Sequence, residues 1–335
     1  PALRALRAHF SHAEIWFLVR SAFVPLFKGA DFVDRVVGLS DSARIIPLLR
    51  MAARMRKERF DLLCSLSPIR RNTLLTLLGS SRYAVGYLSL GKKIPNFLKE
   101  SRVSSIGINL VSQEKYAQEN IAESALKVCY ALGIPCSERA PHLEFSEKSV
   151  RIAEEALASR EAAPPIPFIV VHPFAGWRYR EWPYANTVEL IKRILSDLAI
   201  HVTLIGSREE EDKLRWITKQ IGNSDDITIL AGEDFATLAV LLSKSLLFIG
   251  SDSGPIHLAS AVGTPCIGLF GPAPPAITGP TRTKNRFLYH RVECSPCKQS
   301  YCIRPQNSCL SLITVDEVYA HVKEALSEAV ASTLV

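Results

Sequence analysis

The stretch that decides the fold runs from Phe248 to His257 and reads Phe-Ile-Gly-Ser-Asp-Ser-Gly-Pro-Ile-His. Its apolar start predicts a buried strand, and Asp252, Ser253 and Gly254 predict a tight turn. The proline that follows is typical of a first helical turn. A turn between a strand and a helix lies at the edge of a parallel sheet where α/β proteins bind ligands, and the helix start favours phosphate. A plain helix cap followed by a core histidine is the alternative interpretation.

The same alternation of strand and helix extends in both directions from this stretch. It predicts an α/β protein with parallel sheets that helices cover on both faces. Expected strands are 14–19, 35–39, 61–66, 83–87, 168–171, 201–205, 227–230, 246–249 and 265–270. Expected helices are 47–56, 72–78, 117–132, 147–159, 185–198, 209–221, 235–243, 254–261 and 315–330.

A linker is expected at residues 161–167, Glu-Ala-Ala-Pro-Pro-Ile-Pro, because each proline removes a donor and restricts its neighbour. With 335 residues the chain is long enough for two domains of about 150 residues each. We therefore expect an N-terminal Rossmann-like domain at 1–160 and a C-terminal one at 161–335, facing each other across a cleft.

The charge favours an anionic partner, since the net charge is +7 and the isoelectric point is about 9.0. Nucleic acid is not expected, because the basic residues are scattered and no zinc-finger spacing or basic zipper is present. A phosphorylated sugar acceptor or an anionic membrane surface fits the charge at least as well. No apolar run reaches the ~20 residues of a membrane span and no signal peptide is visible. A cytoplasmic protein, peripheral on the inner face of the membrane, is expected.

Residues 249–272 resemble the donor-binding signature of glycosyltransferase family 9, which contains the lipopolysaccharide heptosyltransferases. The family pattern Asp-(Ser/Thr)-Gly-x-x-His corresponds to Asp252, Ser253, Gly254 and His257, with Pro255 between them. The resemblance implies a GT-B fold in which this turn binds the diphosphate of a nucleotide-sugar donor. It implies no cofactor.

A second segment of the resemblance spans 170–183, Val-Val-His-Pro-Phe-Ala-Gly-Trp-Arg-Tyr-Arg-Glu-Trp-Pro. It implies a donor-binding turn at Ala175 and Gly176. Arg180 takes the place of a family lysine that contacts the donor phosphates, and a guanidinium can grip phosphate with two nitrogens. Glu181 and Phe174 depart from the family pattern. An exposed surface cation is the alternative interpretation of Arg180.

A third segment, 203–209, resembles a strand-Gly-x-x-Glu element of the family. It implies that Glu209 accepts hydrogen bonds from the nucleoside. Glu210 and Glu211 are adjacent, and a solvated acidic helix start is the alternative interpretation.

The implied reaction is transfer of a heptose from ADP-L-glycero-D-manno-heptose to a lipopolysaccharide core sugar, with inversion. Arg70 and Arg71, together with Lys92 and Lys93, suit the anionic groups of that acceptor; solvated surface cations are the alternative interpretation. The family's general base is an aspartate in a Gly-Asp turn before a helix that ends Pro-Ala-Leu, the residues with which this chain starts. We therefore expect an N-terminally truncated chain whose catalytic base and first strand precede Pro1.

Four cysteines, Cys294, Cys297, Cys302 and Cys309, form a C-x2-C-x4-C-x6-C run. The spacing is compatible with zinc, with disulfides or with a redox-sensitive cluster. No bound metal is the favoured prediction, because the resemblance implies no metal dependence.

Two other functions remain open on the sequence. One is a different GT-B nucleotide-sugar enzyme, such as an epimerase, which would carry acid and base carboxylates. The other is a non-catalytic protein that still binds a nucleotide sugar. An NAD dehydrogenase is not expected, since no Gly-x-Gly-x-x-Gly follows a strand.

Overall fold

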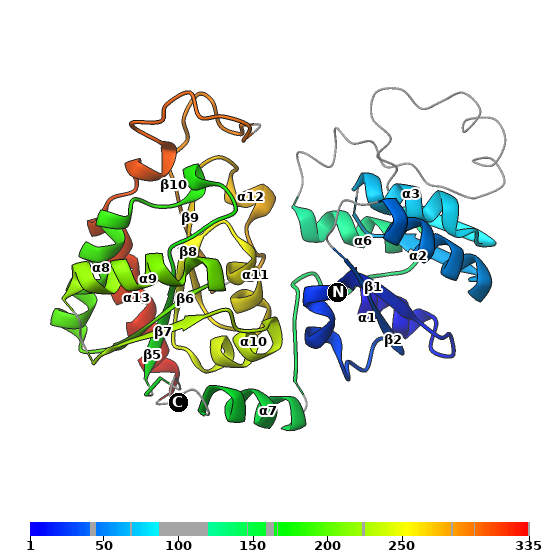
Figure 1. Cartoon of the computed structure of the whole chain (residues 1–335), viewed down its shortest axis with the longest axis horizontal. Helices are drawn as coiled ribbons and strands as arrows, with labels where there is room; N and C mark the ends of the chain where they lie inside the picture. Colours follow the sequence, from blue (N-terminus) through cyan, green and yellow to red (C-terminus); the bar gives the residue numbers. More distant parts are fainter. Residues whose placement is uncertain are drawn as a thin grey trace. The chain divides into compact units, whose positions relative to one another are not determined.

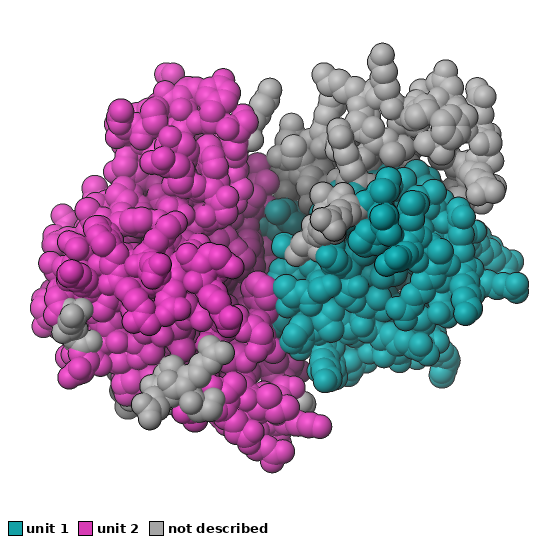
Figure 2. Space-filling view, viewed as in Figure 1, with its two compact units in different colours: residues 1–139 teal, residues 140–335 magenta. Residues whose placement is uncertain are grey.

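The computed structural model describes residues 1–40, 45–67, 69–86, 120–145, 147–158, 164–165, 167–222, 225–282, 284–297 and 299–333. It divides into two compact units, unit 1 (Pro1–Arg139) and unit 2 (Ala140–Val335), coloured separately in Figure 2. The division falls earlier than the linker expected at 161–167. The reason is that helix α7 (Glu147–Ala158) packs on α10 (Phe235–Lys244), where Lys244 pairs with Glu154.

Unit 2 contains a six-stranded parallel sheet in the order β7-β6-β5-β8-β9-β10. Numbered along the chain, this is the 3-2-1-4-5-6 order of a doubly wound nucleotide-binding domain, with its switch point between β5 and β8. The strands are β5 (Phe168–His172), β6 (His201–Gly206), β7 (Ile227–Ala231), β8 (Phe248–Ser251), β9 (Cys266–Phe270) and β10 (Arg286–Tyr289).

Helices cover both faces of this sheet (Figure 1). Helices α9 and α13 each pack against α8 on one face, and α10 packs against α11 on the other. Both faces are therefore buried, and strands β5, β8 and β9 are buried along their whole length. The helices are α8 (Tyr184–Leu198), α9 (Glu211–Ile221), α11 (Gly254–Ala261), α12 (Pro275–Thr278) and α13 (Val315–Thr333). Short 3-10 turns cover Arg178–Arg180, Arg208–Glu210 and Cys309–Leu312.

The described part of unit 1 contains two parallel strand pairs, β1 with β2 and β3 with β4. Helices α2 and α3 pack side by side, and Arg56 Nε donates to the Leu78 carbonyl at 2.6 Å. The strands are β1 (Trp16–Arg20), β2 (Arg35–Leu39), β3 (Leu62–Ser65) and β4 (Tyr83–Gly86). The helices are α1 (Ala2–His9), α2 (Ile45–Glu58), α3 (Arg70–Gly79) and α6 (Ile121–Ala131), with a 3-10 turn at Ser21–Phe27.

The expected α/β architecture with parallel sheets is thus confirmed. Every strand predicted from the sequence is present, within two residues at each end, except that position 87 of the predicted 83–87 strand lies outside the described residues. Strand β10 was missed, because Arg286–Tyr289 has only four residues at the edge of the sheet and no helix pattern follows it directly. Positions 117–119 and 159, at the ends of two predicted helices, also lie outside the described residues.

Candidate nucleotide-sugar site

The turn after β8 carries a buried carboxylate and an open helix start. Asp252 is 8 % exposed, and Thr278 Oγ1 from α12 donates to its Oδ2 at 3.1 Å. Ser253 is the N-cap residue of α11, yet its side chain makes no capping bond. Gly254 is exposed at the first helical position. The backbone N–H groups of this helix start therefore have no side-chain acceptor at Ser253, which leaves them able to bind an anion.

Ser253 is instead held by the neighbouring strand end. Its hydroxyl donates to the Ser251 carbonyl at 3.2 Å, and its oxygen lies 3.2 Å from Nδ1 of His172, the last residue of β5. When the hydroxyl hydrogen goes to Ser251, the imidazole donates through Nδ1–H. Burial lowers the pKa of His172 to about 4, so the ring is neutral at pH 7. A neutral imidazole thus ties the two strand ends together at the switch point.

Arg180 reaches across to the same turn. Its Nη1 donates to the Asp252 carbonyl at 3.3 Å, and lies 3.9 Å from Oδ2 of that residue. Its Nε donates to Gln299 Oε1 at 2.5 Å. These contacts hold a half-buried guanidinium beside the start of α11. Arg180 is therefore not a freely solvated surface cation, which was the alternative interpretation.

His257 lies one turn into α11. Its ring is 44 % exposed and its Nε2 lies 3.9 Å from Asp252 Oδ1. The carboxylate of Asp252 is therefore flanked by Arg180 on one side and by His257 on the other. The alternative interpretation of His257 as a core residue is wrong, because the side chain is exposed.

Glu181, which departs from the family pattern, shapes the loop after β5. The backbone N–H of Ala175 points to Glu181 Oε1 at 3.4 Å, and the Tyr184 hydroxyl donates to Glu181 Oε2 at 2.7 Å. Glu181 therefore folds the loop onto α8. Gly176 is exposed, and a side chain there would meet nothing within 4 Å.

The three glutamates after β6 have three different environments. Glu210 accepts from the Ser207 backbone N–H at 2.7 Å in a capping box. Glu211 pairs with Arg215 four residues later. Glu209 is exposed, and hydrogen bonds from its own backbone N–H and from Ser207 lower its pKa. Of the three, Glu209, the residue predicted to bind the nucleoside, is the exposed one, whereas Glu210 and Glu211 are half-buried.

The predicted acceptor residues lie in unit 1. Arg70 opens helix α3, and Arg71 Nη1 donates to the carbonyl of Ser40, just after β2, at 3.5 Å. Arg71 Nε is buried and has no hydrogen-bond partner among the residues that the structure describes. Lys92 and Lys93 lie outside the described residues.

The four cysteines of the C-x2-C-x4-C-x6-C run are free thiols that line one pocket. Burial raises the pKa of Cys309 to about 11. Over the described residues, which include all four cysteines, no group of three or more His, Cys, Asp or Glu side chains is placed to hold a metal ion.

Three contacts of this site were not predicted from the sequence. They come from His172, Thr278 and Gln299. His172 directly follows the strand predicted at 168–171 and ends the observed β5, so its position was a usable signal. Gln299 contacts Arg180 across 119 positions and Thr278 contacts Asp252 across 26, so no local pattern indicates either one.

Comparison of the sequence with known protein families finds one match. The sequence model of glycosyltransferase family 9 (heptosyltransferase) matches residues 48–307. Lipopolysaccharide heptosyltransferase 2 of Salmonella typhimurium is 24 % identical over 339 residues, covering 97 % of this chain and 93 % of the relative.

Solved structures share the fold. A family 9 glycosyl transferase of Veillonella parvula aligns with a TM-score of 0.79 at 18 % identity, over 97 % of this chain and 92 % of the other. The ADP-heptose lipopolysaccharide heptosyltransferase II of Escherichia coli aligns with a TM-score of 0.74 at 20 % identity, over 98 % and 93 %. None of the helices in the described part of the chain has the length and apolar character that crossing a bilayer requires.

Proposed function

This chain belongs to glycosyltransferase family 9, and we propose that it transfers a heptose or a related sugar from an ADP-activated donor to a lipopolysaccharide core acceptor, with inversion at the anomeric carbon. The observation that carries the proposal is the cluster of Arg180, Asp252 and the open start of α11. The names of the Salmonella and Escherichia coli relatives support the choice of sugar and acceptor.

In this proposal the departing diphosphate is the group that unit 2 recognises. The N–H groups at the start of α11 and the Arg180 guanidinium supply hydrogen bonds and positive charge where charge develops in displacement. Asp252 orients Arg180 and His257 rather than touching the phosphates, because a carboxylate repels them. Ala175, Gly176 and Pro255 would border the donor, and Glu209 would accept hydrogen bonds from the nucleoside.

Titration calorimetry with ADP, UDP, GDP and NAD tests the donor proposal. We expect selective ADP binding that weakens about 10- to 100-fold in Arg180→Ala, since charge-assisted hydrogen bonds are lost. Asp252→Ala should also weaken it, because the carboxylate that orients Arg180 and His257 is removed. Lys219→Ala, which removes one exposed charge at the far end of α9, is the matched control and should bind ADP as the wild type does.

Other outcomes favour other functions. A preference for UDP or GDP would indicate a different GT-B nucleotide-sugar enzyme. Selective ADP binding without transfer of heptose to deacylated core oligosaccharide would indicate a non-catalytic nucleotide-sugar-binding protein. Binding of none of the four nucleotides would contradict the proposal.

We propose Arg70 and Arg71 as contacts for the anionic acceptor. Arg71 supports this because its buried Nε has no hydrogen-bond partner among the described residues, which is unusual for a polar atom inside a protein. Arg71→Ala should raise the KM for the acceptor and leave ADP affinity unchanged. An unchanged acceptor KM would contradict the assignment.

A peripheral position on the cytoplasmic face of the inner membrane is also part of the proposal. Four apolar side chains near the starts of α2 and α3 are between 50 and 61 % exposed: Ile45, Ile46, Leu49 and Ile69. Helices α2 and α3 together carry six basic residues and one acidic residue. Exposed apolar side chains beside net positive charge suit an anionic lipid surface.

Co-sedimentation with vesicles tests this surface. The wild type should bind phosphatidylglycerol vesicles and not phosphatidylcholine vesicles, with binding lost at high salt. A triple Ile45→Ser, Ile46→Ser, Leu49→Ser variant should lose binding. Ile152→Ser, which removes an equally exposed side chain from α7, should not. Equal sedimentation of both variants would contradict the assignment.

A further inference from the structure

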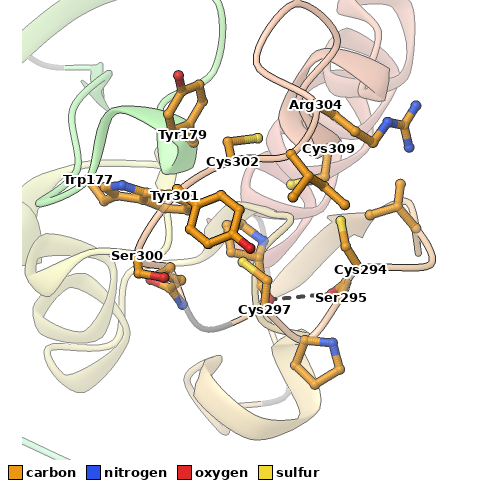
Figure 3. Close-up of a pocket in the computed structure, with 15 residues that line it drawn as sticks. Trp177, Tyr179, Cys294, Ser295, Cys297, Ser300, Tyr301, Cys302, Arg304 and Cys309 are labelled. Atoms are coloured by element: carbon orange, nitrogen blue, oxygen red, sulfur yellow. Dashed lines mark hydrogen bonds between the residues drawn. The ribbon is translucent and has the colours of Figure 1, made fainter.

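The cysteines of the C-x2-C-x4-C-x6-C run surround one cavity of about 310 Å³ (Figure 3). All four are half-buried free thiols. The cavity is many times larger than the space that one water molecule needs, so a small oxidant can reach the sulfur atoms. The proposed function uses none of these thiols.

Two of the four cysteines contact the same two residues just after β9. The backbone N–H of Cys297 donates to the Pro272 carbonyl at 2.9 Å. A Cβ on Gly271 would lie 2.5 Å from Cys309 Sγ, so this sulfur lies directly against the Gly271 backbone. Because Gly271 and Pro272 are consecutive, they bring Cys297 and Cys309 to the same point of the sheet edge.

The protonation of Cys309 agrees with this neighbourhood. Burial raises the pKa of its thiol to about 11, and Cys297 contributes in the same direction, ahead of Cys294. Cys309 is therefore a neutral thiol at pH 7, and Cys297 is the cysteine that influences it most. A thiolate is the reactive form of cysteine, so Cys309 is not suited to the first attack on an oxidant.

Both cysteines are connected to Arg180, each through its own segment. Gln299, two positions after Cys297, accepts from Arg180 Nε at 2.5 Å. The 3-10 turn that Cys309 opens packs on the 3-10 turn that Arg180 ends. A change in the separation of the two cysteines therefore reaches the guanidinium from two sides.

The contact between Gln299 and Arg180 depends on the position of the chain around it. Gln299 has a φ of 57°, in the left-handed region that a residue with a side chain adopts infrequently. Local preference alone does not hold Gln299 in this conformation. Movement of the neighbouring Cys297 would therefore release the glutamine from Arg180.

We infer that Cys297 and Cys309 form a reversible disulfide when a hydroperoxide oxidises the chain, and that this bond weakens binding of the donor diphosphate. The effect on the donor rests on the proposed function, which assigns Arg180 to the diphosphate. The disulfide itself does not depend on that assignment.

The oxidation has two steps. The Cys297 thiolate attacks an oxygen of the hydroperoxide, the O–O bond breaks, and an alcohol (water, from hydrogen peroxide) leaves as Cys297 becomes a sulfenic acid. The Cys309 sulfur then attacks the Cys297 sulfur, the S–O bond breaks, and the Cys309 proton leaves with the oxygen as water. Two thiols lose two electrons, which reduce the peroxide. A dithiol reverses the reaction by exchange and is itself oxidised to a disulfide.

Formation of the bond changes the geometry around Arg180. The two sulfurs are brought to ~2.05 Å from each other, so the segments that carry them have to move. Gln299 and the turn at Arg178–Arg180 lie on or against these segments. We expect ADP affinity to fall about tenfold on oxidation, because Arg180 loses a charge-assisted hydrogen bond that orients it.

Peptide mapping of the full chain tests the disulfide. Hydrogen peroxide treatment, alkylation of the remaining thiols, proteolysis and tandem mass spectrometry should show Cys297 linked to Cys309, and dithiothreitol should remove the link. Cys297→Ser and Cys309→Ser should each abolish it. Cys136→Ser, which removes a half-buried thiol from unit 1, is the matched control and should leave it unchanged. A link between another pair of cysteines, or higher oxidation without a link, would overturn the assignment.

Titration calorimetry tests the effect on the donor site. Oxidised wild type should bind ADP about tenfold more weakly than the reduced chain, and dithiothreitol should restore the affinity. Cys297→Ser should bind ADP like the reduced wild type both before and after peroxide. Equal ADP affinities of the linked and reduced chains would overturn the coupling. Failure of the reduced chain to bind ADP would contradict the proposed function, and the peptide map would still decide on the disulfide.

Discussion

At the residue scale, the glutamates that follow β6 show how neighbours in sequence can differ in function. Glu210 caps a helical turn, Glu211 pairs with Arg215, and Glu209 is exposed. The sequence could predict an acidic residue here but could not choose among the three. The choice depends on exposure, since Glu209 is exposed and Glu210 and Glu211 are half-buried.

Single substitutions of Glu209 and of Glu210 should separate an effect on ADP affinity from an effect on the free energy of unfolding. Glu209→Gln should weaken ADP binding and leave the unfolding free energy unchanged. Glu210→Ala should lower that free energy by about 1 kcal/mol, because a capping interaction is lost, and leave ADP affinity unchanged. Calorimetric titration and urea unfolding measure the two effects. Loss of ADP affinity in Glu210→Ala but not in Glu209→Gln would indicate that Glu210 contacts the nucleoside.

His172 should make unfolding depend on pH. Its pKa is about 4 in the folded chain and about 6.5 when unfolded, so the unfolded state binds the proton first as pH falls. The resulting loss of stability begins near pH 6.5 and reaches about 3 kcal/mol near pH 4, at 1.36 kcal/mol per unit of pKa. Urea unfolding of wild type and His172→Gln between pH 7 and pH 4 checks this. The stability advantage of the wild type should shrink over that range, whereas parallel curves would contradict it.

At the scale of elements, α11, β9 and β10 pack around a glycine. A Cβ on Gly268 would lie 2.5 Å from Phe270 Cε2, 2.7 Å from Ile256 Cδ1 and 2.9 Å from Phe287 Cδ1. These distances are shorter than any ordinary contact between carbon atoms. The absence of a side chain is what lets α11, and with it the candidate anion site, lie directly on the sheet.

Gly268→Ala should therefore destabilise the protein by about 1–3 kcal/mol, the usual cost of overpacking a core. The midpoint of urea unfolding measures it. Gly176→Ala is the matched control, since a Cβ there meets no atom within 4 Å, and its midpoint should not move. Equal midpoints in the two variants would show that the core around Gly268 relaxes freely.

Helices and strands could be predicted from the sequence more completely than contacts between side chains. Buried parallel strands such as β5 and β9 consist mainly of consecutive apolar residues, so their positions and approximate lengths are visible in the sequence. Strand β10 has only four residues, and its pairing with β9 is a tertiary property. For the same reason the sequence could predict a ligand turn at Asp252 but not its contact with Thr278, which α12 brings from another loop.

At the scale of the whole molecule, all residues of the candidate donor site belong to unit 2. Calorimetric melting of the intact chain should therefore show two transitions, of which ADP shifts only one. At a hundredfold excess over its dissociation constant, ADP should add about 2.7 kcal/mol to the stability of that unit. A single transition, or equal shifts of both, would contradict independent units.

The boundary between Arg139 and Ala140 has a consequence for recombining family members. A chimera joined within the proline-rich residues 161–167 would take α7 from one parent and α10 from the other, breaking their shared interface and the Lys244–Glu154 pair. A crossover after Arg139 keeps that interface from a single parent. Residues 140–335 are then the segment to exchange between glycosyltransferases in order to change their nucleotide-sugar preference.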